Sequence, residues 1–404
     1  MQKRFAPDAG GVFPEWEEVT LGDILEINPK TEEKIADEFY YADLASINNG
    51  VFTHGAAINH NEAPGRAQRV VHIDDVLFQS VNAENLGHYH YTKDKELDKQ
   101  FVASTGFFLL RMKNGCNAFL YQLLFTKAFN QEVHKYSAGS IYPAINITEF
   151  KKIKVRIPKS IEEQRKIAAA LAAYDEMIAV KTAKLETWQE CKKRMVKEIF
   201  GREKRFRDDD GNEFPEWEEK TLGEIAEIFD GVHQTPKYTE EGIKFVSVEN
   251  IENLIGSKKY ISKDAFEKNY KNNIPKKNDI FMTRIGDVGR VALIETDEQL
   301  AFYVSLALVR TKNCSNVSPK YLLYAMESKL FQSELWKRTL HAAFPKKINM
   351  GEIGNCKIMI PKSLEEQQKI GSFLAEIDKE IEIQKEFIKT YAEGKKRMMR
   401  ELMA

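Results

Sequence analysis

The chain contains the stretch FPEWEEVTLGDILEI at Phe13–Ile27 and repeats it as FPEWEEKTLGEIAEI at Phe214–Ile228. The two stretches are identical at 12 of 15 positions and begin 201 residues apart. A repeat at this distance indicates two structural units of similar design, and a fold assigned without it would be wrong as a whole.

A second repeated stretch begins with IPKS. It reads IPKSIEEQRKIAAALAAYDEMI from Ile157 and IPKSLEEQQKIGSFLAEIDKEI from Ile360, which is 203 residues later. The two spacings, 201 and 203 residues, add up to the chain length of 404. The sequence is therefore a closed two-fold repeat that is cut at one of its two joints. We expect halves related by a pseudo-dyad and chain ends that lie close together, an arrangement that tolerates circular permutation.

Each IPKS stretch predicts the start of a long helix. Ser160 and Ser363 stand three residues before Glu163 and Glu366, which is the spacing of a capping box. Apolar residues then recur at steps of four and three. In the first copy they are Ile167, Leu171, Tyr174, Ile178, Leu185 and Trp188, and in the second Ile370, Leu374, Ile377, Ile381, Ile388 and Tyr391.

This spacing favours a coiled-coil seam, and the pseudo-dyad predicts that the two helices run antiparallel and pack on each other. The alternative is two separate amphipathic helices on two separate domains. Polar residues interrupt the seam at equivalent places in both copies, which favours the coiled coil. These residues are Lys181 and Lys192 in the first copy and Gln384 and Lys395 in the second.

The parts between the repeats, residues 20–156 and 221–359, share a layout but differ strongly in sequence. Short β-like runs and helical stretches predict an α+β fold: two α/β domains in a pseudo-two-fold arrangement, separated by two long antiparallel coiled-coil helices. We place the domains at residues 1–157 and 214–360, the central repeated region with its helix at 158–213, and the distal helix at 361–404. One scaffold with two different surfaces suggests recognition of two different things.

Composition indicates a soluble globular protein. Apolar residues make up 43% of the chain, charged residues 30%, and no apolar run approaches the roughly 18 residues that span a bilayer. The N-terminus lacks a signal-peptide pattern. The four cysteines lie far apart without a CxxC motif, which favours free thiols in a reducing cytoplasm. A net charge of −1 gives no sign of nucleic-acid binding, so any such surface has to be local.

No catalytic or metal-binding constellation stands out. Pro7-Asp8 followed by Glu32-Glu33-Lys34 superficially resembles a metal-dependent nuclease, but the second half lacks the later residues. His88 and His90 could form half of a metal site on a strand, yet no further ligand stands at a completing distance. Phosphate-binding loops, nucleophile elbows and HExxH motifs are absent from the sequence. The sequence predicts neither an active site nor a metal site.

A nucleic-acid surface is indicated locally. Residues 256–277 hold seven lysines, Lys258 and Lys259 first, with aromatic residues between them. This density suits phosphate contacts, and a solvated charged loop is the alternative. Arg pairs with guanine edges and Asn or Gln with adenine edges, although each candidate could equally be an ordinary surface group. The other DNA-binding candidates are Arg66, Gln68, Arg69, Ser80, Asn82, Lys135, Ser140, Tyr142, Gln234, Thr235, Lys237, Arg284, Lys346 and Lys347.

The whole organisation resembles the specificity subunit of type I restriction–modification systems. The junction phrases FPEWEE-x-TLGEI and IPKS-x-EEQ-x-KI and the ending KKRM are similar to those of that family, over essentially the whole chain. The resemblance implies two target-recognition domains, each reading one half of a bipartite, asymmetric DNA sequence across a helical spacer. It implies that this chain is not itself an enzyme.

The resemblance also implies partners. These are double-stranded DNA, two methyltransferase subunits that dock on the helices, and restriction subunits, all in the cytoplasm and without a membrane. S-adenosylmethionine would be bound by the methyltransferase subunits, ATP and Mg by the restriction subunits, and no cofactor by this chain. The alternative function is a two-headed scaffold whose domains grip proteins.

Overall fold

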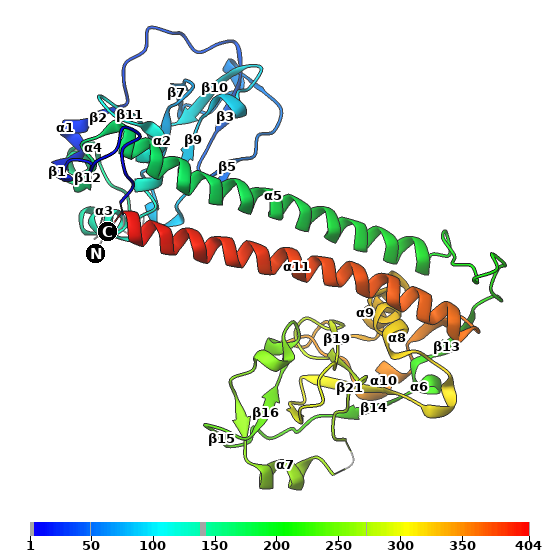
Figure 1. Ribbon diagram of the computed structural model, residues 1–404. Coiled ribbons are helices and arrows are strands. Elements are labelled where there is room, and N and C mark those ends of the chain that lie inside the picture. The colour runs from blue at the N-terminus through cyan, green and yellow to red at the C-terminus, as the bar shows by residue number, and fades with distance from the viewer. Residues whose placement is uncertain (1–3, 49, 138–142, 272, 404) are drawn as a thin grey trace. The chain divides into compact units, whose positions relative to one another are not determined.

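The computed structural model describes residues 4–48, 50–137, 143–271 and 273–403. The chain divides into two compact units, and Figure 1 shows their elements. Unit 1 comprises residues 1–181 and 386–404, and unit 2 comprises residues 182–385. Each unit therefore contains an α/β domain and a part of both long helices. Among the described residues, no helix combines the length and apolar character that a membrane crossing requires.

Unit 1 is built on two four-stranded sheets. The first has the order β2-β11-β8-β9 and is antiparallel, with β2 at Leu25–Ile27, β11 at Phe107–Met112, β8 at Val76–Gln79 and β9 at Tyr89–His90. The second has the order β6-β3-β10-β7, with β6 at Ile58–Asn59, β3 at Glu38–Ala42, β10 at Gln100–Ser104 and β7 at Ala67–Val71. It is mixed, because β3 and β10 run parallel. All four residues of β8 are buried, which explains why this strand reads as a nearly continuous apolar run.

Short helices cover the first sheet of unit 1. Phe119, Phe129 and Phe150 of these helices join Phe78 and Phe108 of the sheet in one buried cluster. The helices are α1 (Leu21–Ile24), α2 (Asn117–Leu123), α3 (Lys127–Ser137) and α4 (Ile147–Lys152). The remaining elements are β1 (Glu17–Thr20), β4 (Ile47–Asn48), β5 (Val51–Phe52), β12 (Lys154–Ile157) and the 3₁₀ turns η1 (His60–Glu62), η2 (Ala83–Asn85) and η3 (Lys93–Lys95).

Unit 2 repeats the first sheet of unit 1 strand for strand. Its order is β14-β21-β18-β19, with β14 at Ala226–Asp230, β21 at Leu306–Thr311, β18 at Ile280–Thr283 and β19 at Val291–Leu293. The second sheet, β15-β17-β16-β20, consists of Tyr238–Thr239, Tyr260–Ile261, Ile243–Val246 and Leu300–Phe302. The two sequence repeats thus enclose two domains with the same principal sheet, as expected.

The other elements of unit 2 are short helices, turns and one strand pair. The helices are α6 (Leu222–Ile225), α7 (Lys263–Asn269), α8 (Pro319–Glu327), α9 (Lys329–Arg338) and α10 (Met350–Gly354). The 3₁₀ turns are η4 (Val248–Asn250), η5 (Leu254–Gly256) and η6 (Asn313–Ser315), and the paired strands are β13 (Glu218–Thr221) and β22 (Lys357–Ile360).

The two repeated stretches pair with each other in both units and form a clasp. β1 pairs with β12 in unit 1, and β13 pairs with β22 in unit 2. Next to β1, the guanidinium of Arg4 donates to both carboxylate oxygens of Glu163 at 2.9 Å, and the indole of Trp16 donates to the same carboxylate at 3.3 Å. Arg205 binds Glu366 in the same way, at 3.2–3.3 Å. Glu163 and Glu366 are fully buried.

The prediction of a complete capping box at the start of the long helix was only half right. Ser160 does accept a hydrogen bond from the amide of Glu163, at 3.4 Å. The carboxylate of Glu163, however, is held by Arg4 and Trp16. A charged hydrogen bond from Arg is stronger than one from a cap amide, which accounts for this choice.

The long helices are α5 (Ile161–Phe200) and α11 (Leu364–Leu402), and they pack antiparallel within each unit. In unit 1 the rings of Tyr174 and Tyr391 lie 6.5 Å apart. In unit 2, Leu185 and Trp188 pack against a cluster that contains Ile377 and Ile381. The alternative of two separate helices is therefore wrong.

The ends of the seam are also part of the domain cores. Ile167 and Leu171 belong to the core of unit 1, and Ile370 and Leu374 to that of unit 2, whereas Ile178 and Ile388 are half-buried. The described chain ends lie together in unit 1, since Phe5 packs against the cluster that contains Leu402 and Met403. The domain boundaries at 157, 213 and 360 stay predictions.

Candidate nucleic-acid interface

Two loops of unit 2 pair with each other beyond the end of β18. The strand loop, residues 284–290, leads from β18 to β19, and the helix loop, residues 339–349, leads from α9 to α10. Gly286 N donates to Lys346 O at 2.8 Å, and Ile348 N donates to Arg284 O at 3.0 Å. The two loops therefore form one platform with a fixed backbone.

Unit 1 contains the same pairing at equivalent positions. Here the strand loop is residues 80–88, between β8 and β9, and the helix loop is represented by residues 143–146, the described segment before α4. Asn82 N donates to Pro143 O at 2.7 Å, and Ile145 N donates to Ser80 O at 3.0 Å. Both domains thus present a pair of bonded loops at equivalent places, after β8 in unit 1 and after β18 in unit 2.

Left-handed backbone conformations mark both strand loops. In unit 1 Asn82 and Leu86 have φ angles of 51°. In unit 2 the positive angles fall on Gly286 and Gly289, at 85° and 100°. A left-handed Leu costs roughly 1–2 kcal/mol, and such strain gathers where function requires a particular loop shape.

Two of the residues predicted to contact bases, one in each unit, instead make hydrogen bonds within the domain that stabilise the paired loops. The hydroxyl of Ser80 is buried and donates to Gly106 O at 2.8 Å. Arg284 is 9% exposed as a whole residue, and its guanidinium donates to Asp230 at 2.7 Å and to Ile348 O at 3.3 Å. The hydroxyl of Ser80 and two guanidinium nitrogens of Arg284 are thus engaged within their domains, so in this arrangement both residues position the loops.

Other candidates of unit 2 face solvent. Gln234, Thr235 and Lys237 are exposed in the loop between β14 and β15, and Lys346 and Lys347 are exposed on the helix loop. These side chains are free to approach a ligand of unit 2.

The lysine run of unit 2 is partly neutralised. Lys258 is exposed, but Lys259 forms an ion pair with Glu249 at 2.8 Å, which raises the pKa of Lys259. Lys277 pairs with Asp297 at 3.0 Å. For Lys259 and Lys277 these ion pairs favour the alternative interpretation, a solvated charged segment.

The candidates of unit 1 lie in several places. Arg66 and Gln68 are exposed, and the amide of Gln68 donates to Gly65 O at 2.6 Å. Arg69, on β7, is half-buried, and burial lowers its pKa. Lys135 pairs with Glu132 on α3. Asn82 is half-buried in the strand loop. Ser140 and Tyr142 lie outside the described residues, and all these DNA contacts stay predictions.

The two histidines on β9 and before it support the domain core. His88 is fully buried, stacks on Phe78 at 4.7 Å and accepts a hydrogen bond from Gln79 N at 3.1 Å. Burial lowers the pKa of His88 to about 3. His90 pairs with Asp74 at 2.8 Å. The described residues contain no group of three or more His, Cys, Asp or Glu side chains arranged for a metal ion.

The acidic residue that suggested a nuclease belongs to the clasp. Asp8 pairs with Lys166 of α5 at 2.7 Å, and the equivalent Asp209 pairs with Lys369 of α11 at 2.7 Å. Because the same ion pair occurs in both repeats, its role in the clasp explains the presence of Asp8, and no nuclease site is needed to explain it.

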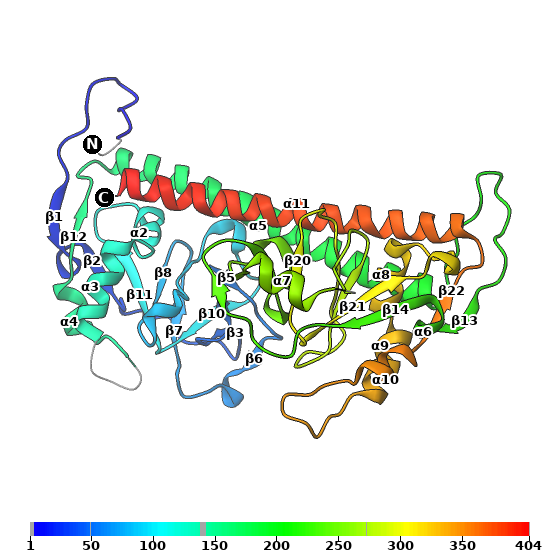
Figure 2. The same ribbon diagram turned by 90° about the horizontal axis from the view of Figure 1, so that it is seen from below.

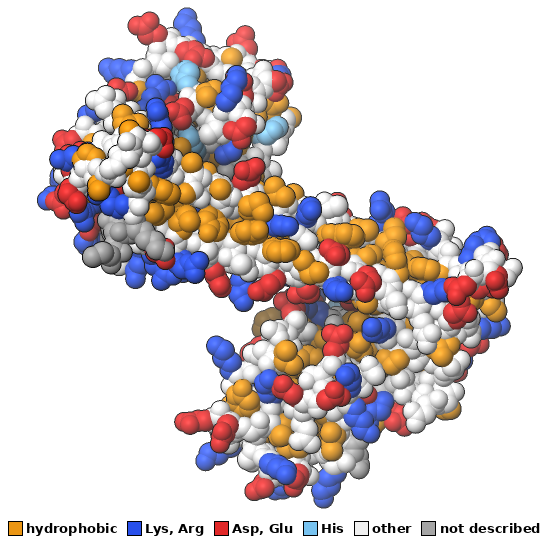
Figure 3. Space-filling view, in the orientation of Figure 1, with side chains coloured by type: hydrophobic (Ala, Val, Ile, Leu, Met, Phe, Trp, Pro, Cys, Tyr) orange, Lys and Arg blue, Asp and Glu red, His pale blue; other side chains and the backbone are white. Residues whose placement is uncertain are grey.

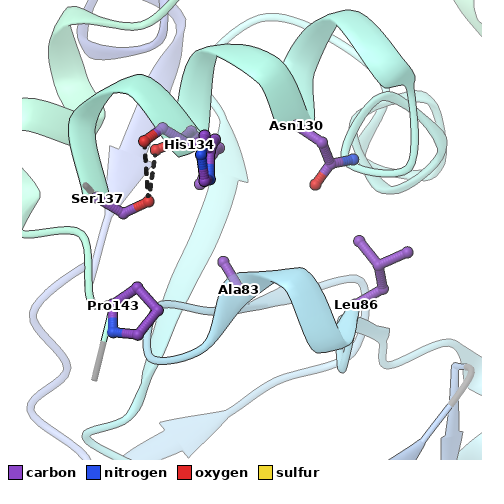
Figure 4. A pocket seen from close by; sticks show the side chains of 7 residues that line it. Ala83, Leu86, Asn130, His134, Ser137 and Pro143 are labelled. Carbon is purple, nitrogen blue, oxygen red and sulfur yellow. Dashed lines mark hydrogen bonds between the residues drawn. The ribbon is translucent and has the colours of Figure 1, made fainter. Parts of the chain in front are cut away.

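A cavity of about 290 Å³ opens beside the helix loop of unit 1, between η2 and α3 (Figure 4). Its wall is mainly apolar and consists of Ala83, Leu86, Asn130, Val133, His134, Ser137 and Pro143. The amide of Asn130 and the hydroxyl of Ser137 already donate to backbone carbonyls. The cavity therefore offers few polar groups to a ligand.

Two exposed aromatic residues near the helix loop of unit 2 were not predicted from the sequence. Phe344 is 104% exposed and Trp336 is 67% exposed. The only signal was their closeness to the Pro-Lys-Lys run, because an aromatic residue in a sequence is ordinarily assigned to a core.

Comparison with known proteins identifies the family. A family model described as "Type I restriction modification DNA specificity domain" matches residues 14–187 and again 215–390. The type I restriction enzyme MjaVIII specificity subunit of Methanocaldococcus jannaschii is 25% identical over 410 residues, which cover 96% of this chain and 92% of that protein. The HindI specificity subunit of Haemophilus influenzae is 24% identical over 193 residues, 46% of this chain and 41% of that protein.

Solved structures show the same fold. The crystal structure of a type I restriction–modification S subunit from M. genitalium has a TM-score of 0.65 at 14% identity and covers 96% of both chains. A structure described as the basis of complex assembly and conformational transition of the type I R-M system has a TM-score of 0.51 at 22% identity, over 96% of this chain and 97% of that one. Nothing in these comparisons supports a general protein scaffold. Since the family model covers both repeats, the chain belongs to the family of type I restriction–modification DNA specificity subunits, which are not themselves catalytic.

Proposed function

We propose that each domain binds one half of a bipartite DNA sequence through its pair of bonded loops. The observation that supports this most strongly is the backbone pairing that the platforms of both units share. Asn82 N bonds Pro143 O in unit 1, and Gly286 N bonds Lys346 O in unit 2, yet the side chains carried by these loops differ. A rigid scaffold with variable loops is suited to binding two different ligands. The two halves of the target are therefore different sequences.

Exposed polar and basic side chains supply the contacts in this proposal. Lys346 and Lys347 lie where they can contact phosphates, which position the domain on the duplex. Gln234 and Thr235 can hydrogen bond to base edges in the major groove. With a net charge of −1 for the whole chain, partner subunits supply much of the positive charge around the DNA.

The long helices set the distance between the half-sites and dock two methyltransferase subunits. Exposed apolar side chains on them support the docking: Met177 and Val180 on α5 and Ile383 on α11 are 37–46% exposed. Figure 3 shows hydrophobic side chains along these helices. Apolar surface of this kind marks protein contacts. S-adenosylmethionine belongs to the methyltransferase subunits, and restriction subunits that use ATP and Mg complete the complex in the cytoplasm.

A domain exchange tests the proposal. Residues 20–156 are replaced by the corresponding part of another specificity subunit, and N6-methyladenine is mapped in the host genome. One half of the methylated motif should change while the other half and the spacer stay the same. The reciprocal control replaces residues 221–359 and should change the other half. A motif that stays constant, or that changes in both halves after one exchange, would reject the assignment of one half-site to each domain.

A further inference from the structure

The helix loop of unit 2 presents an aromatic side chain to water on a fixed backbone. Phe344 is 104% exposed. On either side of it, Ala343 N donates to Leu340 O at 3.3 Å, and Leu340 N donates to Lys347 O at 2.7 Å. Figure 2 shows this loop projecting from the domain between α9 and α10. Its base is joined to the strand loop by the bond from Gly286 to Lys346. The loop is therefore a small hairpin with an apolar tip.

Folding of this chain gives no reason for an aromatic tip. A fully exposed Phe contributes no packing, whereas a buried aromatic side chain is among the largest contributions to an interface. Trp336, at the end of α9, is also 67% exposed, and its ring lies 4.7 Å from that of His341. The apolar surface at the tip is thus available for a partner.

Charge indicates which partner fits this tip. Residues 339–349 contain Lys346 and Lys347 and no Asp or Glu. Both lysines are exposed, and no described carboxylate lies within ion-pair distance of either. By contrast, both cations at the end of α9 have acidic partners: Lys337 pairs with Glu334 at 2.9 Å, and Arg338 pairs with Glu334 at 3.2 Å and with Glu352 at 3.3 Å. Two unpaired cations beside an apolar tip match DNA, which offers phosphates next to stacked bases.

We propose that Phe344 enters the DNA half-site of unit 2 and makes an apolar contact with its bases, while Lys346 and Lys347 contact the neighbouring phosphates. This inference rests on the proposed function and names a specificity-determining residue for it. Phe side chains are able to cover thymine methyl groups or to wedge between base pairs. Either contact depends on base identity, whereas the lysine contacts do not.

The test uses the complex of this chain with its methyltransferase subunits. Binding is measured to a duplex with the mapped methylation motif and to a duplex in which the half read by unit 2 is scrambled. F344A should weaken binding to the intact motif by about 10- to 100-fold and leave binding to the scrambled duplex within about twofold. F344L, which keeps an apolar tip, should restore part of the loss. The control V12A truncates another exposed apolar residue, 85% exposed in unit 1, and should change neither.

The outcomes separate this inference from the proposed function. If the wild-type complex distinguishes the duplexes and F344A does so equally well, Phe344 does not read bases and the inference is wrong. If F344A instead prevents assembly with the methyltransferase subunits, the tip is a protein contact, and the inference is also wrong. A wild-type complex that cannot distinguish the duplexes would reject the proposed function itself.

Discussion

Lys395 on α11 lies 2.6 Å from the carboxylate of Asp175 on α5 within unit 1. In unit 2, Lys192 on α5 lies 2.9 Å from Asp378 on α11, so the same pair recurs with the helices exchanged. Each aspartate is also held by its domain, since Gln122 donates to Asp175 at 2.9 Å and Tyr324 to Asp378 at 2.7 Å. A charged residue in an apolar seam fixes register and orientation.

Reversing one charge of the unit 1 pair should destabilise that unit. K395D places two carboxylates together and is expected to lower the free energy of unfolding by about 1–2 kcal/mol, because Asp175 is only partly shielded from solvent. The double variant D175K/K395D should recover part of the loss. Urea unfolding of the two single variants and the double variant measures the coupling. Strictly additive single effects would show that the pair does not set the register.

The buried glutamates of the clasp should be more sensitive than exposed ones. E163A leaves the guanidinium of Arg4 without its main partner and removes the acceptor of Trp16, so we expect a loss of about 3 kcal/mol. E366A should also destabilise unit 2, because Arg205 loses its partner Glu366, but by less, since the indole of Trp217 makes no hydrogen bond to Glu366. Hydrogen exchange of each unit measures the loss separately.

A matched control is available on the same arginine. Glu15 lies 3.5 Å from Arg4 but is 87% exposed, so E15A should cost less than 1 kcal/mol. Equal effects of E15A and E163A would mean that burial does not determine the strength of the clasp.

The repeats explain how much of this fold was predictable. Seam residues such as Leu171 and Leu374 were found because a helix repeats its buried face at fixed steps, which is a local property. The partner of Arg284 was not found, because Asp230 is distant in sequence and only the folded sheet brings the two together. Phe344 was missed for the opposite reason: no local pattern distinguishes an aromatic residue kept for a ligand from one that belongs in a core.

The buried imidazole of His88 should make unit 1 sensitive to mild acid. Its pKa is lowered from 6.5 to about 3, so the unfolded chain binds a proton between these values and the folded chain does not. Stability is therefore complete above about pH 6.5 and falls below it, by up to about 1.4 kcal/mol per pH unit. H88N keeps an acceptor for Gln79 N but cannot titrate. Urea unfolding between pH 4.5 and 7 measures the free energy of unfolding at each pH. This free energy should depend less steeply on pH in H88N than in the wild type.

In H88N the free energy of unfolding should still fall to some extent as the pH is lowered. Burial also lowers the pKa of His90, although Asp74 opposes the shift, so His90 adds to the same window. An H88N slope equal to the wild-type slope would show that His88 is protonated in the folded domain.

The lysines of the helix loop should control the salt dependence of DNA binding. Each phosphate contact adds roughly 0.9 to the slope of log K against log salt concentration, so K346A/K347A should lower the slope by about 1–2. Affinity should fall similarly for the specific and the scrambled duplex, because phosphates carry no sequence information. K329A, at the start of α9, is the matched control. An unchanged slope in K346A/K347A would place these lysines outside the interface.

The length of the paired helices should determine the unread spacer between the half-sites. Asp175 and Lys192 are 17 residues apart on α5, and Asp378 and Lys395 are 17 residues apart on α11. Removing one heptad from both intervals, residues 178–184 and 381–387, shortens the two intervals by the same amount, so they stay equal and both ion pairs can still form. At 1.5 Å per residue the loss is about 10 Å, which corresponds to about three base pairs. Methylation mapping should therefore show both half-sites intact and a spacer about three base pairs shorter.

Removing the heptad from α5 alone makes the two intervals unequal. The pairs formed by Lys192 and Lys395 then cannot both keep their register, so one unit must give up its ion pair and its seam contacts. We expect the single deletion to abolish methylation and the double deletion to retain it. The variant that lacks more residues should therefore be the active one. A double deletion that methylates the original spacer would show that the helices hold the domains without measuring the distance between them.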